Sequence, residues 1–251
     1  MKQSKKNICN LSCTVFEPNI LNKENLQLVI LCHGYGAPGN DLVSVGEYLC
    51  QSDSSISKNV CFIIPEAPLS LDNIGLSGSR AWWNIDMIAL QRAIDGIDPR
   101  DLSKDIPNGM PLASNMLMDL VNKLMLDYSI SSTRIILGGF SQGSMVTTDV
   151  ALKMEEPPGG LIVMSGTLVC ESVWRKLAQK RGVMKIFQSH GRSDPLLPFN
   201  AAERLRGLFM KAELEHKFLP FDGFHEIPES VLLHTSEFIK EFSNQNKTIL
   251  L

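Results

Sequence analysis

The chain has 251 residues, of which 44% are hydrophobic and 20% charged, and its net charge is −3 at pH 7. This length and composition suit one globular α/β domain with a substantial buried core. The weakly acidic balance argues against a nucleic-acid partner, and no segment approaches the roughly 18 uninterrupted apolar residues of a membrane span. We therefore expect neither nucleic-acid binding nor stable membrane insertion.

Short apolar runs alternate with amphipathic stretches along the whole sequence, which predicts alternating strands and helices. Apolar runs such as Leu28-Val29-Ile30-Leu31 are typical of parallel strands that helices cover on both faces. We predict one α/β domain over residues 1–251, built on a doubly wound, mostly parallel sheet with helices on both faces. In chain order, the predicted elements are strand 28–32, helix 41–51, strand 60–64, helix 114–128, strand 134–140, helix 144–154, strand 160–165, helix 170–180, strand 184–189, helix 201–213, strand 217–219 and helix 229–242.

Residues 65–113 interrupt this alternation. The segment contains five prolines and four glycines and is longer than an ordinary loop. We interpret it as an irregular insertion, since it lacks a core of its own, and expect it to cover any active site that the domain carries. Trp82 and Trp83 lie within it, and the sequence leaves open whether they pack as core or line a substrate pocket.

Cysteine usage indicates the cellular compartment. The six cysteines are scattered, and none forms a C-x-x-C pair. The charged N-terminus is not followed by an apolar stretch of signal-peptide length. These features predict a cytoplasmic protein. No group of His, Cys and Asp has metal-ligand spacing, so no metal is expected.

The sequence Gly139-Phe140-Ser141-Gln142-Gly143 matches the G-x-S-x-G pattern of a nucleophile elbow. An apolar strand precedes it and an amphipathic helix follows, which is the strand–turn–helix context that the motif requires. The glycines allow strand and helix to approach closely, and the sharp turn holds the serine in a strained conformation. We predict that Ser141 is a nucleophile.

A serine nucleophile needs a base, and the base needs an acid that orients it. Asp194 follows the strand at 184–189, and His225 follows the strand at 217–219. The order Ser141, Asp194, His225 is that of an α/β-hydrolase, and each residue lies after the carboxyl end of a separate strand.

Other residues compete for these roles. His190 also ends a strand, but we expect it to shape the acid loop, while His216 and His234 are expected on a surface and a helix face. Asp222 and Glu226 are alternative acids. Both are so close in sequence to the predicted base that neither needs a separate strand, and chain order therefore disfavours them.

The tetrahedral intermediate requires hydrogen-bond donors for its oxyanion. The backbone N–H of Gln142, next after the nucleophile, is one predicted donor, and that of Tyr35, in the loop after the strand at 28–32, is the other. The same loop, residues 34–39, also fits the dinucleotide pattern G-x-G-x-x-G, with Asp53 further on. Pro38 interrupts this rival motif where its helix should begin.

Six segments of the chain are His33-Gly34-Tyr35-Gly36, Pro65-Glu66-Ala67-Pro68, Ala81-Trp82-Trp83-Asn84-Ile85-Asp86, Gly138-Gly139-Phe140-Ser141-Gln142-Gly143, His190-Gly191-Arg192-Ser193-Asp194-Pro195 and Gly223-Phe224-His225. Together these segments resemble the phospholipase/carboxylesterase family, which includes acyl-protein thioesterases. The resemblance implies an α/β-hydrolase that cleaves carboxylic esters, or thioesters or lysophospholipids, through an acyl-enzyme and without a cofactor. It implies a small-molecule ester as substrate. Relatives include dimers, so a homodimer is one expectation. The alternatives are a catalytically inactive hydrolase-fold binding protein and a dinucleotide-dependent enzyme.

Overall fold

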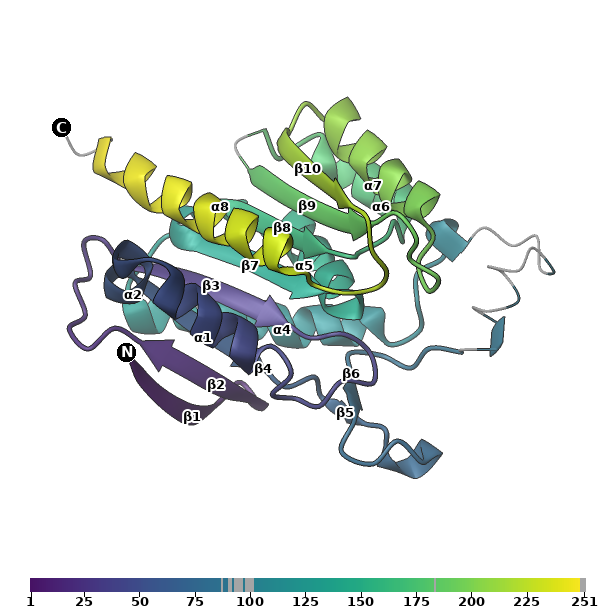
Figure 1. The fold of residues 1–251 in the computed structure, drawn as a ribbon, viewed down its shortest axis with the longest axis horizontal. Coiled ribbons are helices and arrows are strands. Elements are labelled where there is room, and N and C mark those ends of the chain that lie inside the picture. The colour runs from purple at the N-terminus through teal and green to yellow at the C-terminus, as the bar shows by residue number, and fades with distance from the viewer. Residues whose placement is uncertain (87, 90–91, 93–96, 98–101, 183, 249–251) are drawn as a thin grey trace.

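An eight-stranded sheet runs through the computed structural model (Figure 1), which describes residues 1–86, 88–89, 92, 97, 102–182 and 184–248. The strand order is β1-β2-β4-β3-β7-β8-β9-β10, and the pairs from β4 to β10 are parallel. In this sheet the pairs β1–β2 and β2–β4, at the N-terminal edge, are antiparallel. The strands are β1 (Lys2–Ile8), β2 (Leu11–Glu17), β3 (Gln27–Cys32), β4 (Val60–Pro65), β7 (Ile135–Phe140), β8 (Gly160–Met164), β9 (Lys185–Gly191) and β10 (Glu215–Phe221).

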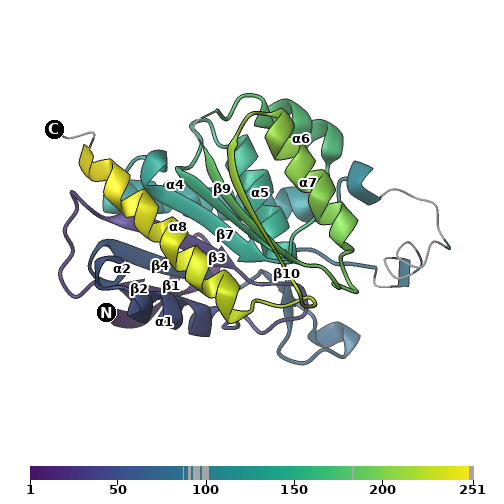
Figure 2. The same cartoon turned by 45° about the horizontal axis from the view of Figure 1, so that its top comes forward.

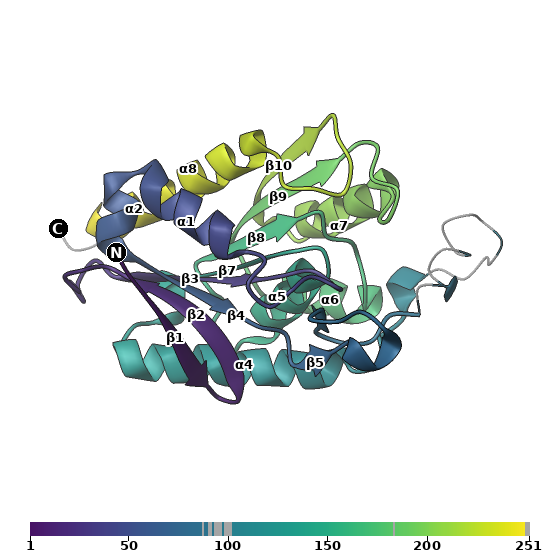
Figure 3. The same cartoon turned by 60° about the horizontal axis from the view of Figure 1, so that its bottom comes forward.

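Helices cover both faces of this sheet, as Figures 1 and 3 show from two sides. One face carries α1 (Val43–Ser52), α2 (Ser54–Asn59) and α8 (Glu229–Thr248), and the other carries α4 (Met110–Tyr128), α5 (Gln142–Lys153), α6 (Glu171–Ala178) and α7 (Phe199–Lys211). Short 3₁₀ turns occur at η1 (Asp72–Ile74), η2 (Leu102–Lys104) and η3 (Ser132–Arg134). The prediction of a doubly wound, mostly parallel α/β sheet is confirmed.

Strand β3 shows how the sequence produces the two layers. Successive side chains of a strand point to opposite faces. Leu28 and Ile30 accordingly join the core beneath α4 and α5, whereas Val29 and Leu31 join the core beneath α1 and α8. A strand of this kind is buried on both sides, which explains its unbroken apolar run.

The N-terminal hairpin β1–β2 was not predicted. Strand β1 is mostly polar and exposed, with lysines that discourage further pairing at this edge of the sheet. The hairpin turns at Cys9 and Asn10, whose φ angles of 48° and 66° are those of a type I′ turn. Its turn lacks the Asn-Gly or Asp-Gly pair that announces most such hairpins.

The segment 65–113 divides into parts with different environments. Ala67, Trp82 and Trp83 belong to the main core, and the short hairpin β5 (Leu69–Ser70) and β6 (Arg80–Ala81) lies near the carboxyl edge of the sheet (Figure 2). Residues 110–113 form the first turn of α4, where Pro111 suits the helix start. Residues 87, 90–91, 93–96 and 98–101 of the predicted insertion lie outside the described residues. Within the described ranges, no helix has the length and hydropathy needed to cross a membrane.

Helix α5 approaches strand β3 more closely than side chains would allow. A β-carbon at Gly143 would lie 1.9 Å from the carbonyl oxygen of Cys32, and one at Gly139 would lie 2.5 Å from the carbonyl carbon of Gly143. Both positions require glycine, because the clashing atoms are backbone and cannot rotate away. This contact brings the first turn of α5 to the carboxyl end of β3.

We expect Gly143→Ala to lower the free energy of unfolding by about 3 kcal/mol or more, because overpacking against backbone forces the helix and strand apart. Urea denaturation measures the effect. Gly207→Ala is the matched control: Gly207 lies inside α7 with nothing within 4 Å of an added β-carbon. That substitution should raise stability by about 0.5–1 kcal/mol. Equal denaturation midpoints for the two variants would contradict the packing argument.

Candidate active site

Ser141 connects β7 to α5 in a strained backbone conformation. Its φ of 53° and ψ of −121° are unusual for a residue with a β-carbon. The backbone N–H of Ser141 donates to the carbonyl of Met164 at 2.9 Å, which fixes the turn to the end of β8. The side chain is half-buried, so the hydroxyl of this candidate nucleophile stands at the sheet edge without being sealed in the core.

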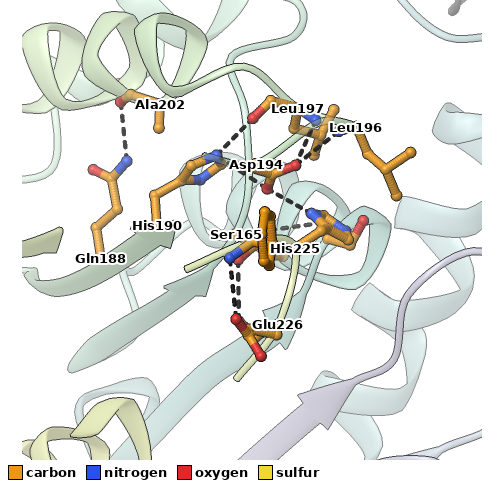
Figure 4. Close-up of polar contacts among 12 residues, drawn as sticks. Ser165, Gln188, His190, Asp194, Leu196, Leu197, Ala202, His225 and Glu226 are labelled. Carbon is orange, nitrogen blue, oxygen red and sulfur yellow. Dashed lines mark hydrogen bonds and ion pairs between the residues drawn. The ribbon is translucent and has the colours of Figure 1, made fainter. Parts of the chain in front are cut away.

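Asp194 and His225 meet above the same edge although 31 positions separate them. His225 Nδ1 lies 2.7 Å from Asp194 Oδ2 (Figure 4). Because an ionised carboxylate only accepts, Nδ1 carries the proton, and Nε2 of the neutral ring is left as the basic nitrogen. The Asp194 side chain is fully buried, whereas that of His225 is 12% exposed. The acid is therefore sealed from solvent and the base is not.

The carboxylate of Asp194 is held from both sides. The amides of Leu196 and Leu197 each donate to Oδ1 at 2.9 Å, while His225 binds Oδ2. Burial opposes ionisation of Asp194, but these hydrogen bonds outweigh it and lower the pKa of the carboxyl group below its ordinary value. Asp194 is consequently an anion that can orient and stabilise a histidine.

The loop that carries His225 is fastened to its surroundings. The amide of Ser193 donates to Gly223 O at 3.0 Å, and Phe224 N donates to the side chain of Glu226 at 3.0 Å. Ser165, at the end of β8, donates to the carbonyl of Glu226 (Figure 4). These bonds join the loop of the candidate acid to the loop of the candidate base, so that the two residues keep a fixed relative position.

The ring of His225 also packs on the elbow. Its centroid lies 4.8 Å from that of Phe140, the residue before Ser141. In the part of the chain that the structure describes, no hydrogen bond joins Ser141 Oγ to His225. Such bonds are often long in the absence of substrate and shorten in the reacting complex. The structure thus brings Asp194 and His225 together and places His225 beside the elbow.

The loop after β3 lies against Ser141. A β-carbon at Gly34 would be 3.2 Å from Ser141 Cβ, so this loop borders the candidate nucleophile directly. Within the described residues, the backbone N–H groups of Tyr35 and Gln142 have no protein acceptor. Gln142 is also the first residue of α5, whose N-terminal end favours negative charge. Both amides are therefore available to an oxyanion.

Comparisons with known proteins identify the family of this chain. Residues 17–243 match the family model described as Phospholipase/Carboxylesterase. The chain belongs to the phospholipase/carboxylesterase family. Membership confirms the resemblance read from the sequence and makes the protein a serine hydrolase of carboxylic esters.

Individual relatives cover almost the whole chain. Acyl-protein thioesterase 1 of Saccharomyces cerevisiae is 27% identical over 222 residues, which is 86% of this chain and 92% of the relative. Acyl-protein thioesterase 1 of Mycosarcoma maydis is 28% identical over 228 residues, covering 88% and 90% respectively. The crystal structure of esterase PE8 matches with a TM-score of 0.72 at 22% identity, covering 96% of this chain and 100% of that one.

The side chain of Gln142 has a role in this family member that the sequence did not reveal. Its Oε1 accepts from Trp82 N at 2.9 Å, and its Nε2 donates to Trp83 O at 2.8 Å. The side chain is buried, and its two bonds cross about 60 positions of sequence. The candidate oxyanion donor Gln142 therefore also fixes the backbone of residues 82–83 through its side chain.

The two tryptophans lie in the core beneath the candidate oxyanion site. Both are almost fully buried, at 1% and 2% exposure. Trp82 Nε1 donates to His33 O at 3.0 Å, and His33 Nε2 accepts from Ala67 N at 3.0 Å. His33 Nδ1–H donates to Gly34 O at 2.8 Å. Burial, the largest effect, lowers the pKa of His33. The ring is therefore neutral, and its hydrogen bonds support the loop after β3 from below.

The rival dinucleotide motif does not have the structure it requires. Helix α1 begins at Val43, beyond the glycine loop, whereas a phosphate-binding helix would begin within the motif. The loop instead pairs with the β5–β6 hairpin, since Gly36 N donates to Arg80 O and Arg80 N donates to Ala37 O, each at 2.9 Å. The glycines of residues 34–39 therefore belong to a loop that pairs with the β5–β6 hairpin, and they do not form a phosphate-binding turn.

The remaining candidates from the sequence lie elsewhere. His234 is on α8 and bonds to Ser230 O, and His216 on β10 bonds to Gln188. Asp222 is almost wholly exposed beside Arg192. Among the described residues, no group of three or more His, Cys, Asp and Glu side chains is placed to hold a metal ion.

We expect Gln142→Met to destabilise the protein by about 2–4 kcal/mol, because the N–H of Trp82 and the C=O of Trp83 lose their partner while buried. Ester hydrolysis should fall as well, since the amide of residue 142 loses its fixed orientation. Thermal unfolding and an ester assay test both effects. Gln179→Met, at an exposed site, should change stability by less than about 0.5 kcal/mol; a similar loss in both variants would refute the bridging role.

Proposed function

We propose that the protein hydrolyses carboxylic esters through an acyl-enzyme on Ser141, with His225 as general base and Asp194 as the acid that orients it. The observation that carries this proposal is the 2.7 Å contact of His225 with the buried Asp194, beside a serine held at φ 53°. A strained serine alone can occur in a turn. A strained serine next to an oriented imidazole has the parts that nucleophilic catalysis needs.

In the proposed reaction, Nε2 of His225 takes the proton of Ser141 as Oγ attacks the ester carbonyl carbon. The imidazolium that forms is stabilised by Asp194, and the same proton then passes to the departing alcohol as the carbon–oxygen bond breaks. Water next attacks the acyl-enzyme as His225 takes its proton, and that proton passes to Ser141 Oγ as the acyl carbon–oxygen bond breaks and the carboxylic acid is released. These steps require no cofactor.

The oxyanion of both tetrahedral intermediates would bind the backbone N–H groups of Tyr35 and Gln142. Support comes from their freedom from protein acceptors and from the contact of Gly34 with Ser141. The bridges from Gln142 and His33 to the 67–83 segment would hold these donors still, which is what electrostatic preorganisation requires.

For substrates, we propose acyl esters and thioesters of small molecules, including lysophospholipids. The relatives described above are named acyl-protein thioesterases, and one of the structural neighbours, PE8, is named an esterase. Thioesters and oxygen esters react through the same acyl-enzyme. We further propose that the 65–113 insertion covers the site and that Trp82 and Trp83 form the wall behind the acyl group. Both side chains are closed from solvent, so neighbouring groups would have to move for direct contact.

We also propose a cytoplasmic location, supported by six free thiols, and no nucleic-acid partner. A homodimer is proposed from the resemblance to the family alone. Light scattering after gel filtration distinguishes a dimer from a monomer of 27.8 kDa.

The decisive experiment compares wild type with Ser141→Ala on p-nitrophenyl esters of increasing chain length. We expect kcat to fall by about 10⁴-fold or more, because the nucleophile is lost while binding groups remain. Ser230→Ala, an exposed serine on α8, should retain full activity.

Labelling with a fluorophosphonate separates the enzyme from an inactive binding protein of the same fold. Wild type should label and Ser141→Ala should not, because only an activated serine attacks the probe. Full turnover in Ser141→Ala would falsify the mechanism. Absence of labelling in the folded wild type would favour the binding protein instead.

A further inference from the structure

A second histidine reaches the carboxylate of Asp194. His190 is the sixth residue of β9, and its side chain is completely buried. Its Nε2 lies 2.7 Å from Leu197 O and 3.3 Å from Asp194 Oδ2, the oxygen that also binds His225 (Figure 4). The carboxylate therefore lies between two imidazole rings.

The tautomer of His190 follows from its partner. A carbonyl oxygen can only accept, so Nε2 carries the hydrogen and donates it to Leu197 O. Nδ1 is buried and has no hydrogen-bond partner in the described chain. Burial, the largest effect, lowers the pKa of His190, although Leu197 O and Asp194 act in the opposite direction. The ring is a neutral donor at pH 7.

Leu197 connects this donor to the acid. Its amide donates to Asp194 Oδ1, and its carbonyl accepts from His190. The turn 194–197 is thereby closed around the carboxylate by one side chain from β9. Since Oδ1 is occupied by the amides of the turn, the other oxygen is left to face His225.

We propose that His190 is a positioning residue for the catalytic acid: by holding Leu197 C=O it keeps the 194–197 turn closed and Asp194 Oδ2 directed at His225. This inference rests on the roles proposed above for Asp194 and His225. The N–H of His190 also places the positive end of a dipole beside Oδ2 without adding a second cation to the site.

Among the described residues, few titratable or charged groups lie near His190. His225 and Asp194 are its titratable neighbours, and Arg192 of the same loop is exposed and lies 3.5 Å from Asp222. Glu226 of the His225 loop accepts from Phe224 N. Replacing His190 with an uncharged residue therefore changes a hydrogen bond and leaves the charge of the site unchanged at neutral pH.

A packing role is the competing explanation. The ring of His190 meets that of Phe199 edge-on, with centroids 6.2 Å apart. His190→Phe keeps an aromatic ring but removes the donor. His190→Gln keeps an N–H at nearly the position of Nε2, whereas the shorter His190→Asn cannot reach Leu197 O.

The test measures kcat, KM and the pH profile of kcat/KM for these three variants. We expect His190→Gln to stay within about threefold of wild type. His190→Phe and His190→Asn should lose about 10–100-fold in kcat with KM nearly unchanged, because the acid no longer holds the base in place. The acidic limb of their profiles should move to lower pH, since a loosened Asp194 stabilises the protonated base less.

His216→Phe is the control, because His216 is a half-buried histidine that hydrogen-bonds a neutral partner, Gln188, on β9. It should leave the pH profile unchanged. Equal kcat values for His190→Gln and His190→Asn would overturn the inference. So would an acidic limb of the kcat/KM profile that stays in place or moves to higher pH in His190→Asn. This Gln–Asn pair decides the matter even where His190→Phe fails to fold.

Asp194→Asn separates this inference from the proposed function. Full activity in that variant would remove Asp194 from the mechanism altogether. A large loss in Asp194→Asn, together with wild-type kinetics in His190→Asn, would overturn only the positioning role of His190.

Discussion

The close crossing of α5 over the end of β3 is the constraint from which the rest of the site follows. With glycine at 143, the first turn of the helix lies on the carbonyl of Cys32. The chain can leave β7 and enter a helix so placed only through a sharp turn, and Ser141 takes the left-handed φ that this turn demands. The same crossing brings the end of β3 beside the elbow. The proposed nucleophile and both proposed oxyanion donors are thus positioned by one packing contact.

Buried polar side chains then hold together parts of the chain that are distant in sequence. Gln142 satisfies one donor and one acceptor of the backbone at 82–83, and His33 accepts from Ala67 while its own carbonyl accepts from Trp82. A buried polar group is costly when it is left unpaired. Each of these side chains therefore disfavours alternative placements of the 67–83 segment more strongly than an apolar residue of equal size, and the loop after β3 becomes part of a rigid unit.

The sequence was sufficient for the features that depend on local pattern. The β-branched, apolar run before Ser141 and the glycines around it predicted the strand, the elbow and the helix, because sterics and burial act on neighbours in the chain. The mostly polar strand Lys2–Ile8 was missed, since an exposed edge strand has little hydrophobic pattern to detect. The bridge from Gln142 could not be predicted. Its partners are backbone groups about 60 residues away, and only the folded chain defines them. The pairing of Asp194 with His225 was an expectation from chain order, whereas the contact of His190 with Leu197 lies beyond any spacing rule.

The buried histidines explain how one imidazole can carry charge in a crowded site. Burial lowers the pKa of both His33 and His190, and each donates to a backbone carbonyl that fixes its tautomer. The ring of His190, which lies beside Asp194, therefore does not compete as a cation for its carboxylate. In the proposed mechanism, proton transfer would therefore place a positive charge on His225, which lies directly against the ionised carboxylate of Asp194. Because the surrounding dipoles are set before the reaction, little reorganisation accompanies that charge, which is the condition under which a buried carboxylate stabilises a transition state more than it stabilises the resting enzyme.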